Sequence, residues 1–212
     1  MNLGNLRESY TQASLNKKQV NIDPLDQFSE WFKDARNAKL KEPNAMNLST
    51  VDAEGQPSVR TVLLKSIADD GFVFYTNYKS RKSVNISLNS KVALHFLWLP
   101  LERQVSIQGN AEKISQEDSL SYFLSRPRGS QLGAWVSDQS REISSKELLV
   151  EKMNALLEKF GDGEIPIPEF WGGFKVKPNK IEFWQGGEDR LHDRIEYFQG
   201  LEGNWKIRRL CP

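Results

Sequence analysis

Short strand-like stretches that follow one another with only turns between them are the feature that most constrains this fold. Residues 45–77 contain AMNLSTV, SVRTVLLKS and FVFYTN, and the joining segments DAEGQP and ADDG are rich in turn-forming residues. Strands joined by short turns pair antiparallel, whereas parallel strands need long crossover connections. We therefore expect an antiparallel meander in this part of the chain.

Further strand candidates follow, and helical patterns separate the blocks. The strand candidates are KVALHFLW, ERQVSIQGNAEKI, FWGGFKVKP, NKIEFWQ, DRIEYFQ and WKIRRL, and the helical patterns span residues 23–40, 80–90, 116–126 and 144–161. Helices do not follow every strand, which disfavours a doubly wound α/β fold. The expected fold is mainly β with peripheral helices (α+β), as a closed or partly closed antiparallel barrel.

Residues 1–22 are polar with scattered charges, and they predict a flexible N-terminal arm. Asp23 suits the N-cap of the first helix, and Pro24 suits its first position. No repeat, low-complexity tract or clear linker divides the rest of the chain. We expect residues 23–212 to form a single domain.

The charge balance and the scarcity of metal ligands exclude several classes of protein. The chain has 29 Lys and Arg against 28 Asp and Glu, a net charge of +1, which argues against a nucleic-acid partner. One cysteine and two histidines do not readily form a zinc site, so no metal is expected. The longest apolar run, residues 92–101, is too short to span a bilayer, and the N-terminus has no apolar signal core. We expect a cytoplasmic protein with no membrane partner.

Basic residues gather in places that suit phosphate, although both common phosphate-binding glycine loops are absent. RTVLLK at 60–65 has an apolar middle between two cations, and strand alternation would place Arg60 and Lys65 on opposite faces. Arg81 and Lys82 stand where a helix begins, and helix N-termini attract anions. Charged strand ends and a solvated basic turn are the alternative interpretations.

A third cluster lies in SYFLSRPRGSQLGAW, at 121–135. Tyr122, Arg126 and Ser130 recur every fourth residue, a spacing that lines one face of a helix, although Pro127 should interrupt that helix. A phenol, a guanidinium and a hydroxyl are good donors to phosphate. The alternative is a helix end with Tyr122 in the core.

The fourth cluster is WQGGEDRLHDRIEYF, at 184–198. Arg190, His192 and Arg194 alternate with their neighbours, so on a strand all three would point to the same side. The alternative is an exposed strand face with its charges paired to nearby carboxylates, those of Glu188, Asp189 and Asp193.

Together these blocks resemble one known family. RTVLLK, FYTNYKSRK, LERQV, YFLSRPRGSQLGAWVSDQS, PEFWGGF and IEFWQGGEDRLHDR resemble, in order and spacing, the pyridoxine/pyridoxamine 5'-phosphate oxidases. The resemblance extends from about residue 7 to the C-terminus. It implies an FMN-binding split β-barrel with Greek-key-like antiparallel strands. It also implies a homodimer, with FMN held at the interface between the subunits.

The resemblance assigns roles to individual residues. Those that would bind FMN are Arg60, Thr61, Val62, Leu63, Leu64, Lys65, Tyr75, Thr76, Arg81, Lys82, Gln104, Gln139, Ser140, Trp184 and Arg194. Those that would bind the substrate are Arg7, Tyr10, Lys65, Tyr122, Arg126, Ser130, Arg190, Leu191 and His192. Arg190 and His192 would be the catalytic pair, facing the pyridine ring.

The implied reaction is oxidation of pyridoxine 5'-phosphate and pyridoxamine 5'-phosphate to pyridoxal 5'-phosphate, as in vitamin B6 biosynthesis and salvage. A hydride would pass from C4' to N5 of FMN, and O2 would reoxidise the flavin and give H2O2. One alternative is another FMN-binding split-barrel oxidoreductase, although the two substrate clusters argue against it. Another is a non-catalytic carrier of pyridoxal phosphate, which would need no flavin.

Overall fold

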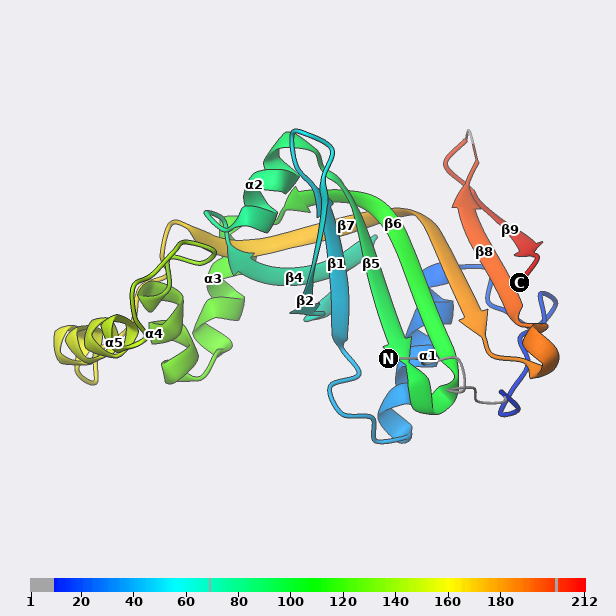
Figure 1. The fold of residues 1–212 in the computed structure, drawn as a ribbon, viewed down its shortest axis with the longest axis horizontal. Helices are drawn as coiled ribbons and strands as arrows, with labels where there is room; N and C mark the ends of the chain where they lie inside the picture. Colours follow the sequence, from blue (N-terminus) through cyan, green and yellow to red (C-terminus); the bar gives the residue numbers. More distant parts are fainter. Residues whose placement is uncertain (1–9, 69, 201) are drawn as a thin grey trace, which may run out of the picture.

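The computed structural model describes residues 10–68, 70–200 and 202–212 (Figure 1). Nine strands form one antiparallel sheet in the order β2-β1-β5-β6-β7-β4-β3, and β8 and β9 continue from β7. The strands are β1 (Ala45–Val51), β2 (Pro57–Leu63), β3 (Ser66–Ala68), β4 (Gly71–Asn77), β5 (Lys91–Trp98), β6 (Arg103–Lys113), β7 (Trp171–Gln185), β8 (Asp193–Gln199) and β9 (Trp205–Leu210). The predicted antiparallel, mainly β fold is confirmed.

The sheet curls because its two ends belong to one continuous segment. The expected strand SVRTVLLKS is divided into β2 and β3, which lie at opposite ends of the strand order. At the corner, the Leu64 N–H donates to the Asn44 carbonyl next to β1, and the Lys65 N–H donates to the Val73 carbonyl in β4. Two consecutive residues thus bond to opposite ends of the sheet, which brings those ends together.

Two of the expected strands are one. FWGGFKVKP and NKIEFWQ form the continuous strand β7, although Pro178 lies between them. The register of β6 against β7 shifts between Gln108 and Gly109, opposite this proline. A proline is tolerated at such a bulge because the hydrogen-bond ladder is already interrupted there, so the N–H that proline lacks is not needed. The sequence prediction of a break was therefore wrong.

Among the described residues, five α-helices lie around the sheet. They are α1 (Pro24–Asn37), α2 (Arg81–Leu88), α3 (Gln116–Ser125), α4 (Arg128–Val136) and α5 (Glu147–Phe160), and the 3-10 turns are η1 (Leu99–Leu101) and η2 (Glu188–Arg190). The predicted cap of α1 is confirmed, since the Asp23 carboxylate accepts the Leu25 N–H at 2.7 Å. On the buried face of α1, the Phe28 ring meets those of Phe72 and Phe96, with centroids 4.9 Å apart in both cases.

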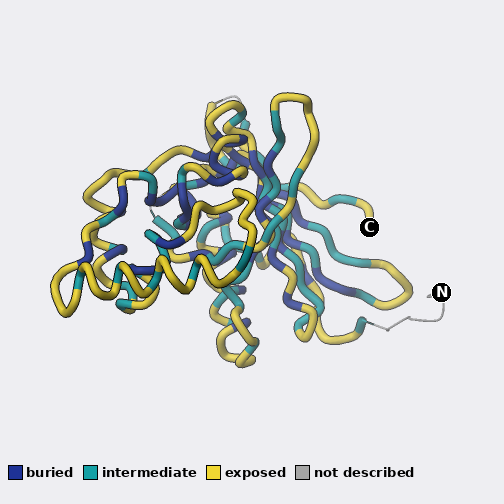
Figure 2. The backbone as a smooth tube through the Cα atoms, turned by 60° about the vertical axis from the view of Figure 1, so that its left-hand side comes forward, coloured by how far each residue is buried: buried dark blue, intermediate teal, exposed yellow. Residues whose placement is uncertain are grey.

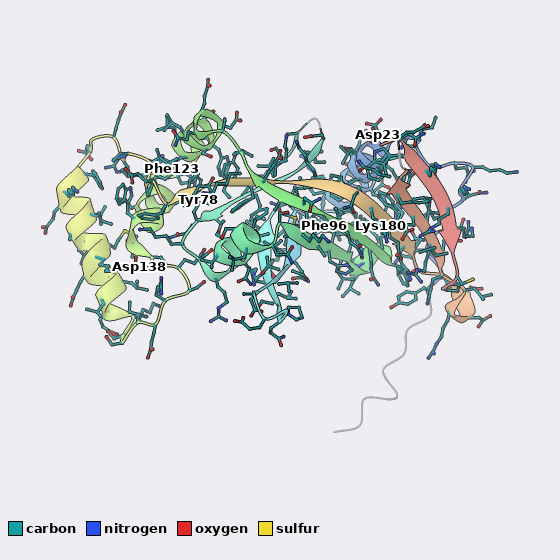
Figure 3. The ribbon with its side chains drawn as sticks, turned by 90° about the horizontal axis from the view of Figure 1, so that it is seen from above. Asp23, Tyr78, Phe96, Phe123, Asp138 and Lys180 are labelled. Atoms are coloured by element: carbon teal, nitrogen blue, oxygen red, sulfur yellow. The ribbon has the colours of Figure 1, made fainter. Side chains whose placement is uncertain are left out.

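Helices α3, α4 and α5 form a separate lobe at one end of the sheet (Figure 1). Its small apolar core contains Phe123, Leu132, Ile165 and Trp171. Figure 3 places Phe123 in this lobe and Phe96 in the barrel, well apart along the long axis. Buried residues are concentrated in the strands, whereas α5 has no buried residue (Figure 2). The lobe can therefore contribute side chains to a space between it and the barrel.

Residues 10–22 lie against the barrel. Leu15 is buried, and its N–H donates to the Asp193 carboxylate at 2.7 Å. The Tyr197 hydroxyl donates to the Asn21 carbonyl at 2.7 Å. Arg7 lies outside the described residues, and the mobility of residues 1–22 stays a prediction. Within the described part of the chain, no helix is long and apolar enough to span a membrane.

Candidate active site

A large cavity of about 1030 Å³ lies between β2, β4, the start of α2 and the α3–α4 segment. Of the predicted site residues, those lining it are Arg60, Thr61, Val62, Leu63, Lys65, Tyr75, Thr76, Arg81, Lys82, Tyr122, Arg126, Ser130, Gln139 and Ser140. Leu64 is buried in the barrel core and is not part of the lining. Among the described residues the lining includes five Arg or Lys side chains and no carboxylate, so this cavity suits anions.

Arg60 and Lys65 line this one cavity, although strand alternation predicted opposite faces. The alternation does not apply, because β2 ends at Leu63 and the chain turns towards β4 at Lys65. The geometric prediction was wrong, and both cations are available to ligands in the same space.

Lys82 is a buried ammonium group with neutral partners. Its Nζ donates to Thr76 Oγ1 and Ser80 Oγ at 3.0 Å, and to Gln139 Oε1 at 2.7 Å. Burial is the larger cause and the positive charge of Arg60 the smaller one, and together they lower the pKa of Lys82 to about 8. A buried cation without a counter-ion is unfavourable, so an anionic ligand here would stabilise the charged form.

Arg60 has the same character. It donates through Nη1 to the Leu48 carbonyl at 3.0 Å and to Thr50 Oγ1 at 2.8 Å. Burial, followed by the positive charge of Arg81, lowers the pKa of Arg60. Arg60 of β2 therefore shares one region of the cavity with Arg81 and Lys82 from the first turn of α2. A phosphate group there would neutralise their positive charges and so relieve their mutual repulsion.

Tyr122, Arg126 and Ser130 line the cavity together, but they do not share a helix face. Helix α3 ends at Ser125, Arg126 is extended with ψ 147°, and α4 begins after Pro127. The interruption expected at Pro127 is confirmed, because a proline disfavours a helical conformation at the preceding residue. The phenol, the guanidinium and the hydroxyl still line one cavity, because α3, the Arg126–Pro127 link and α4 each contribute one of them.

Arg126 has an unpaired buried nitrogen. Its Nη1 has no hydrogen-bond partner among the described residues. Its guanidinium lies 4.7 Å from the centroid of the Trp171 ring, and burial lowers its pKa. An unsatisfied buried donor costs roughly 1–3 kcal/mol, which a ligand oxygen would relieve.

Trp171 is a cavity residue that the sequence reasoning missed. Its ring lies nearly parallel to those of Tyr75 and Tyr122, with interplanar angles of 12° and 8°. Tyr75 and Tyr122 stack at 3.9 Å, and burial raises the pKa of Tyr75 to about 12, which keeps its phenol neutral. The available signal was a tryptophan directly before two glycines, at the start of an expected strand.

A second cluster lies at the other end of the sheet, near η2 and β8 (Figure 1). Tyr10 packs edge-on against Trp184 and His192 at 5.8 and 5.7 Å, and Trp184 and His192 lie 4.6 Å apart. The Gly187 N–H donates to Nδ1 of His192 at 3.1 Å. A backbone N–H can only donate, so neutral His192 carries its proton on Nε2.

Arg190 and His192 do not lie on a strand. Arg190 ends η2, and β8 begins only at Asp193. Asp189 and Arg190 have positive φ values of 51° and 65°, so alternation fails across this turn and the prediction of one shared strand face was wrong. Asp193 pairs with Arg209, and no ion pair of Arg190 occurs among the described residues.

Arg194 does lie on a strand, in a row of three predicted cofactor residues. Gln104 is opposite Trp184, and Trp184 is opposite Arg194, across β6, β7 and β8. The Arg194 guanidinium binds both carboxylate oxygens of Glu182, at 2.8 and 3.0 Å. The large cavity of this chain is not lined by the residues of this end, which are Tyr10, Gln104, Trp184, Arg190, Leu191, His192 and Arg194. Leu191 and His192 instead line a cavity of about 380 Å³ beside the C-terminus.

The chain matches two family profiles. Residues 32–159 match a family described as Pyridoxamine 5'-phosphate oxidase, and residues 171–212 match a Pyridoxine 5'-phosphate oxidase C-terminal dimerisation region. Two curated relatives carry the names of pyridoxine/pyridoxamine 5'-phosphate oxidases. The protein from Hydrogenovibrio crunogenus is 55% identical over 100% of this chain and 99% of its own length. The protein from Crocosphaera subtropica is 56% identical over 100% of both chains.

Solved structures agree on the architecture. PhzG from Burkholderia lata 383, in complex with tetrahydrophenazine-1-carboxylic acid, is 26% identical and superposes with a TM-score of 0.90, covering 97% of this chain and 100% of its own. A pyridoxamine 5'-phosphate oxidase-related, FMN binding protein from Nostoc punctiforme superposes with a TM-score of 0.71 at 14% identity, covering 91% of this chain and 100% of its own. The Nostoc punctiforme protein shares the fold of this chain.

Proposed function

This chain belongs to the pyridoxamine 5'-phosphate oxidase family, and from that premise we propose how its residues carry out the family's reaction. The protein is an FMN-dependent oxidase that converts pyridoxine 5'-phosphate and pyridoxamine 5'-phosphate to pyridoxal 5'-phosphate. It is a homodimer. The observation that carries the assignment of residues is the large cavity, with its five cations and no described carboxylate.

The residues of the cavity fit FMN. Buried Lys82 has only neutral hydrogen-bond partners, and the cations Arg60 and Arg81 that line the same cavity add to the positive charge around it. A phosphate dianion supplies the missing negative charge. When bound, FMN would supply the two-electron acceptor for oxidation at the C4' carbon of the substrate, and we propose O2 as the final electron acceptor, reduced to H2O2.

We assign the lining of the cavity to two ligands. Arg60, Arg81 and Lys82 hold the phosphate end of FMN. The residues along its ribityl chain and ring are Thr61, Val62, Leu63, Tyr75, Thr76, Gln139 and Ser140. The residues for the substrate phosphate are Lys65, Tyr122, Arg126 and Ser130. This phosphate contact gives binding energy remote from the reacting carbon, which orients the ring.

The second cluster belongs, in this proposal, to the site of the other subunit. Within one chain it lies at the opposite end of the sheet from the α3–α4 lobe (Figure 1). Apart from Tyr10 and Gln104, its residues lie within the segment that matches the dimerisation region. In the dimer, the row Gln104, Trp184 and Arg194 of one subunit would complete the flavin site of its partner. Tyr10, Arg190, Leu191 and His192 would cover the substrate ring there.

His192 and Arg190 have different chemical roles in this arrangement. The Gly187 N–H occupies Nδ1 of His192, so neutral His192 can offer only its Nε2–H, as a hydrogen-bond donor to a substituent of the pyridine ring. Arg190 is a permanent cation that orients and polarises the ring but transfers no proton. His192 would therefore contribute a hydrogen bond from its Nε2–H that orients and polarises the ring substituent.

Anaerobic titration of the purified protein with pyridoxine 5'-phosphate tests this function. The visible flavin band should bleach as substrate is added and return when air is admitted. A band that bleaches with neither this substrate nor pyridoxamine 5'-phosphate would contradict the substrate. A colourless protein that does not bind added FMN would contradict the cofactor site and favour a carrier of pyridoxal phosphate.

The titration of Lys82 predicts a pH dependence for FMN binding. The phosphate favours the ammonium form, so above about pH 8 each binding event takes up a proton, and the FMN Kd should rise by up to roughly tenfold per pH unit. The unfolded chain keeps the ordinary pKa of 10.5, so the apo-protein should gain stability as the pH rises from about 8 towards that value. Fluorescence titration of apo-protein with FMN measures the Kd.

Lys82→Arg is the control for this titration, because arginine keeps its charge at high pH. The variant should lose the rise in Kd above about pH 8. An equal rise in the variant and in the wild type would show that another group is responsible.

A further inference from the structure

Thr50 is a polar residue at a position where its strand faces the core. The inward side chains of β1 are Met46, Leu48 and Thr50, and Thr50 is fully buried. Its Oγ1 accepts hydrogen bonds from Nη1 of Arg60 at 2.8 Å and from Nδ2 of Asn85 at 3.1 Å. A buried hydroxyl is unfavourable unless it is bonded, so these two partners account for its presence.

The Thr50 hydroxyl joins three elements. Thr50 is in β1, Arg60 in β2 and Asn85 in α2, and Asn85 is itself buried. Arg60 is opposite Leu48 in the β1–β2 register, so its guanidinium reaches diagonally to Thr50. The Thr50 oxygen thus links α2 to β1 and to the Arg60 guanidinium, in addition to the β1–β2 ladder and the bond from Arg60 to the Leu48 carbonyl.

Two of these elements carry the cations of the cavity. Arg60 comes from β2, and Arg81 and Lys82 occupy the first turn of α2. Like charges repel, and among the described residues no carboxylate lines the cavity to hold them together. The Thr50 hydroxyl is uncharged, and the hydrogen bonds that it accepts can hold Arg60 and α2 in place before an anion binds.

We propose that Thr50 is a positioning residue for the FMN phosphate site, which keeps Arg60 aligned with the first turn of α2, and that Asn85 is its partner on the helix. Thr50 does not line the cavity and acts through Arg60. The inference rests on the proposed function, in which Arg60, Arg81 and Lys82 hold the phosphate of FMN.

Thr50→Val tests this inference, because valine has the same shape but accepts no hydrogen bond. The apo-variant should bind FMN about tenfold more weakly, as expected for loss of one bond to a charged group. Its affinity for riboflavin, which lacks the phosphate, should equal that of the wild type. Thr50→Ser keeps the hydroxyl and should restore FMN binding. Equal losses for both flavins, or no loss for FMN, would overturn the inference.

A double-mutant cycle separates positioning from general destabilisation. In an Arg60→Ala background, Thr50→Val should weaken FMN binding less than it does in the wild type, because only its bond to Asn85 of α2 remains. An additive loss would overturn the inference. If Thr50→Val does not fold, Asn85→Ala removes the second donor and should produce a smaller loss that is again specific to FMN. An equal loss for riboflavin would contradict the inference in the same way.

A different result would contradict the proposed FMN phosphate site itself. A wild-type protein that binds FMN no more tightly than riboflavin would have no phosphate site at Arg60, Arg81 and Lys82. A wild type that prefers FMN, with Thr50→Val unchanged, would overturn the role of Thr50 alone.

Discussion

Arg190→Ala should lower turnover roughly 100-fold while FMN stays bound, because a contact between a charged group and the substrate contributes about 1.5–3 kcal/mol. Arg190 is exposed at the end of η2 and outside the row of Gln104, Trp184 and Arg194. Its loss should therefore affect the substrate and leave the flavin in place. Steady-state kinetics together with the visible flavin spectrum of the purified variant measure both effects.

The backbone of Arg190 calls for a matched control. Its φ of 65° strains an alanine but suits glycine. Arg190→Gly should therefore lose as much activity as Arg190→Ala while keeping a higher Tm. Release of flavin by either variant would contradict the division of this end of the sheet between cofactor and substrate.

Arg126→Ala should raise the KM for pyridoxine 5'-phosphate roughly 100-fold, with a smaller change in kcat. Loss of one partner from a buried, hydrogen-bonded charge pair costs about 2–5 kcal/mol. The unpaired buried Nη1 of Arg126 would be that partner for the substrate phosphate. The phosphate contact should be about equally strong in the bound substrate and in the transition state, so KM should carry most of the effect. Initial rates over a range of substrate concentrations separate the two constants.

Arg128→Ala is the matched control for Arg126→Ala. Arg128 begins α4 and donates to the carbonyls of Gly161 and Gly163, and it does not line the cavity. Its loss should lower Tm and leave KM near that of the wild type. An unchanged KM in Arg126→Ala would remove Arg126 from the substrate site.

Local patterns predicted the elements whose causes are local. Asp23 and Pro24 marked the start of α1, and alternation marked β1 and β5, because caps and pleats depend on residues a few positions apart. The cation clusters at 60–65 and 81–82 were also evident, since charge can be read directly from a sequence.

The predictions that failed depend on partners distant in the chain. FWGGFKVKP and NKIEFWQ were expected to be two strands, but β7 continues through Pro178 at a register shift of β6. There Gly109 lies so close to Lys177 and Pro178 that a Cβ would clash. Trp171 went unnoticed because its ring partners come from β4 and α3. Arg190 and His192 were placed on a strand because alternation gives no warning of two consecutive residues with positive φ.

The separation of the two functional clusters within one chain has a genetic consequence. A subunit carrying Arg126→Ala and one carrying Arg190→Ala are each expected to be defective, but in different halves of the shared site. A hybrid dimer of the two would hold one site with both lesions and one with neither. Random pairing makes half of all dimers hybrid, so co-expression of the two defective alleles, assayed at a substrate concentration near the wild-type KM, should recover roughly one quarter of the wild-type sites.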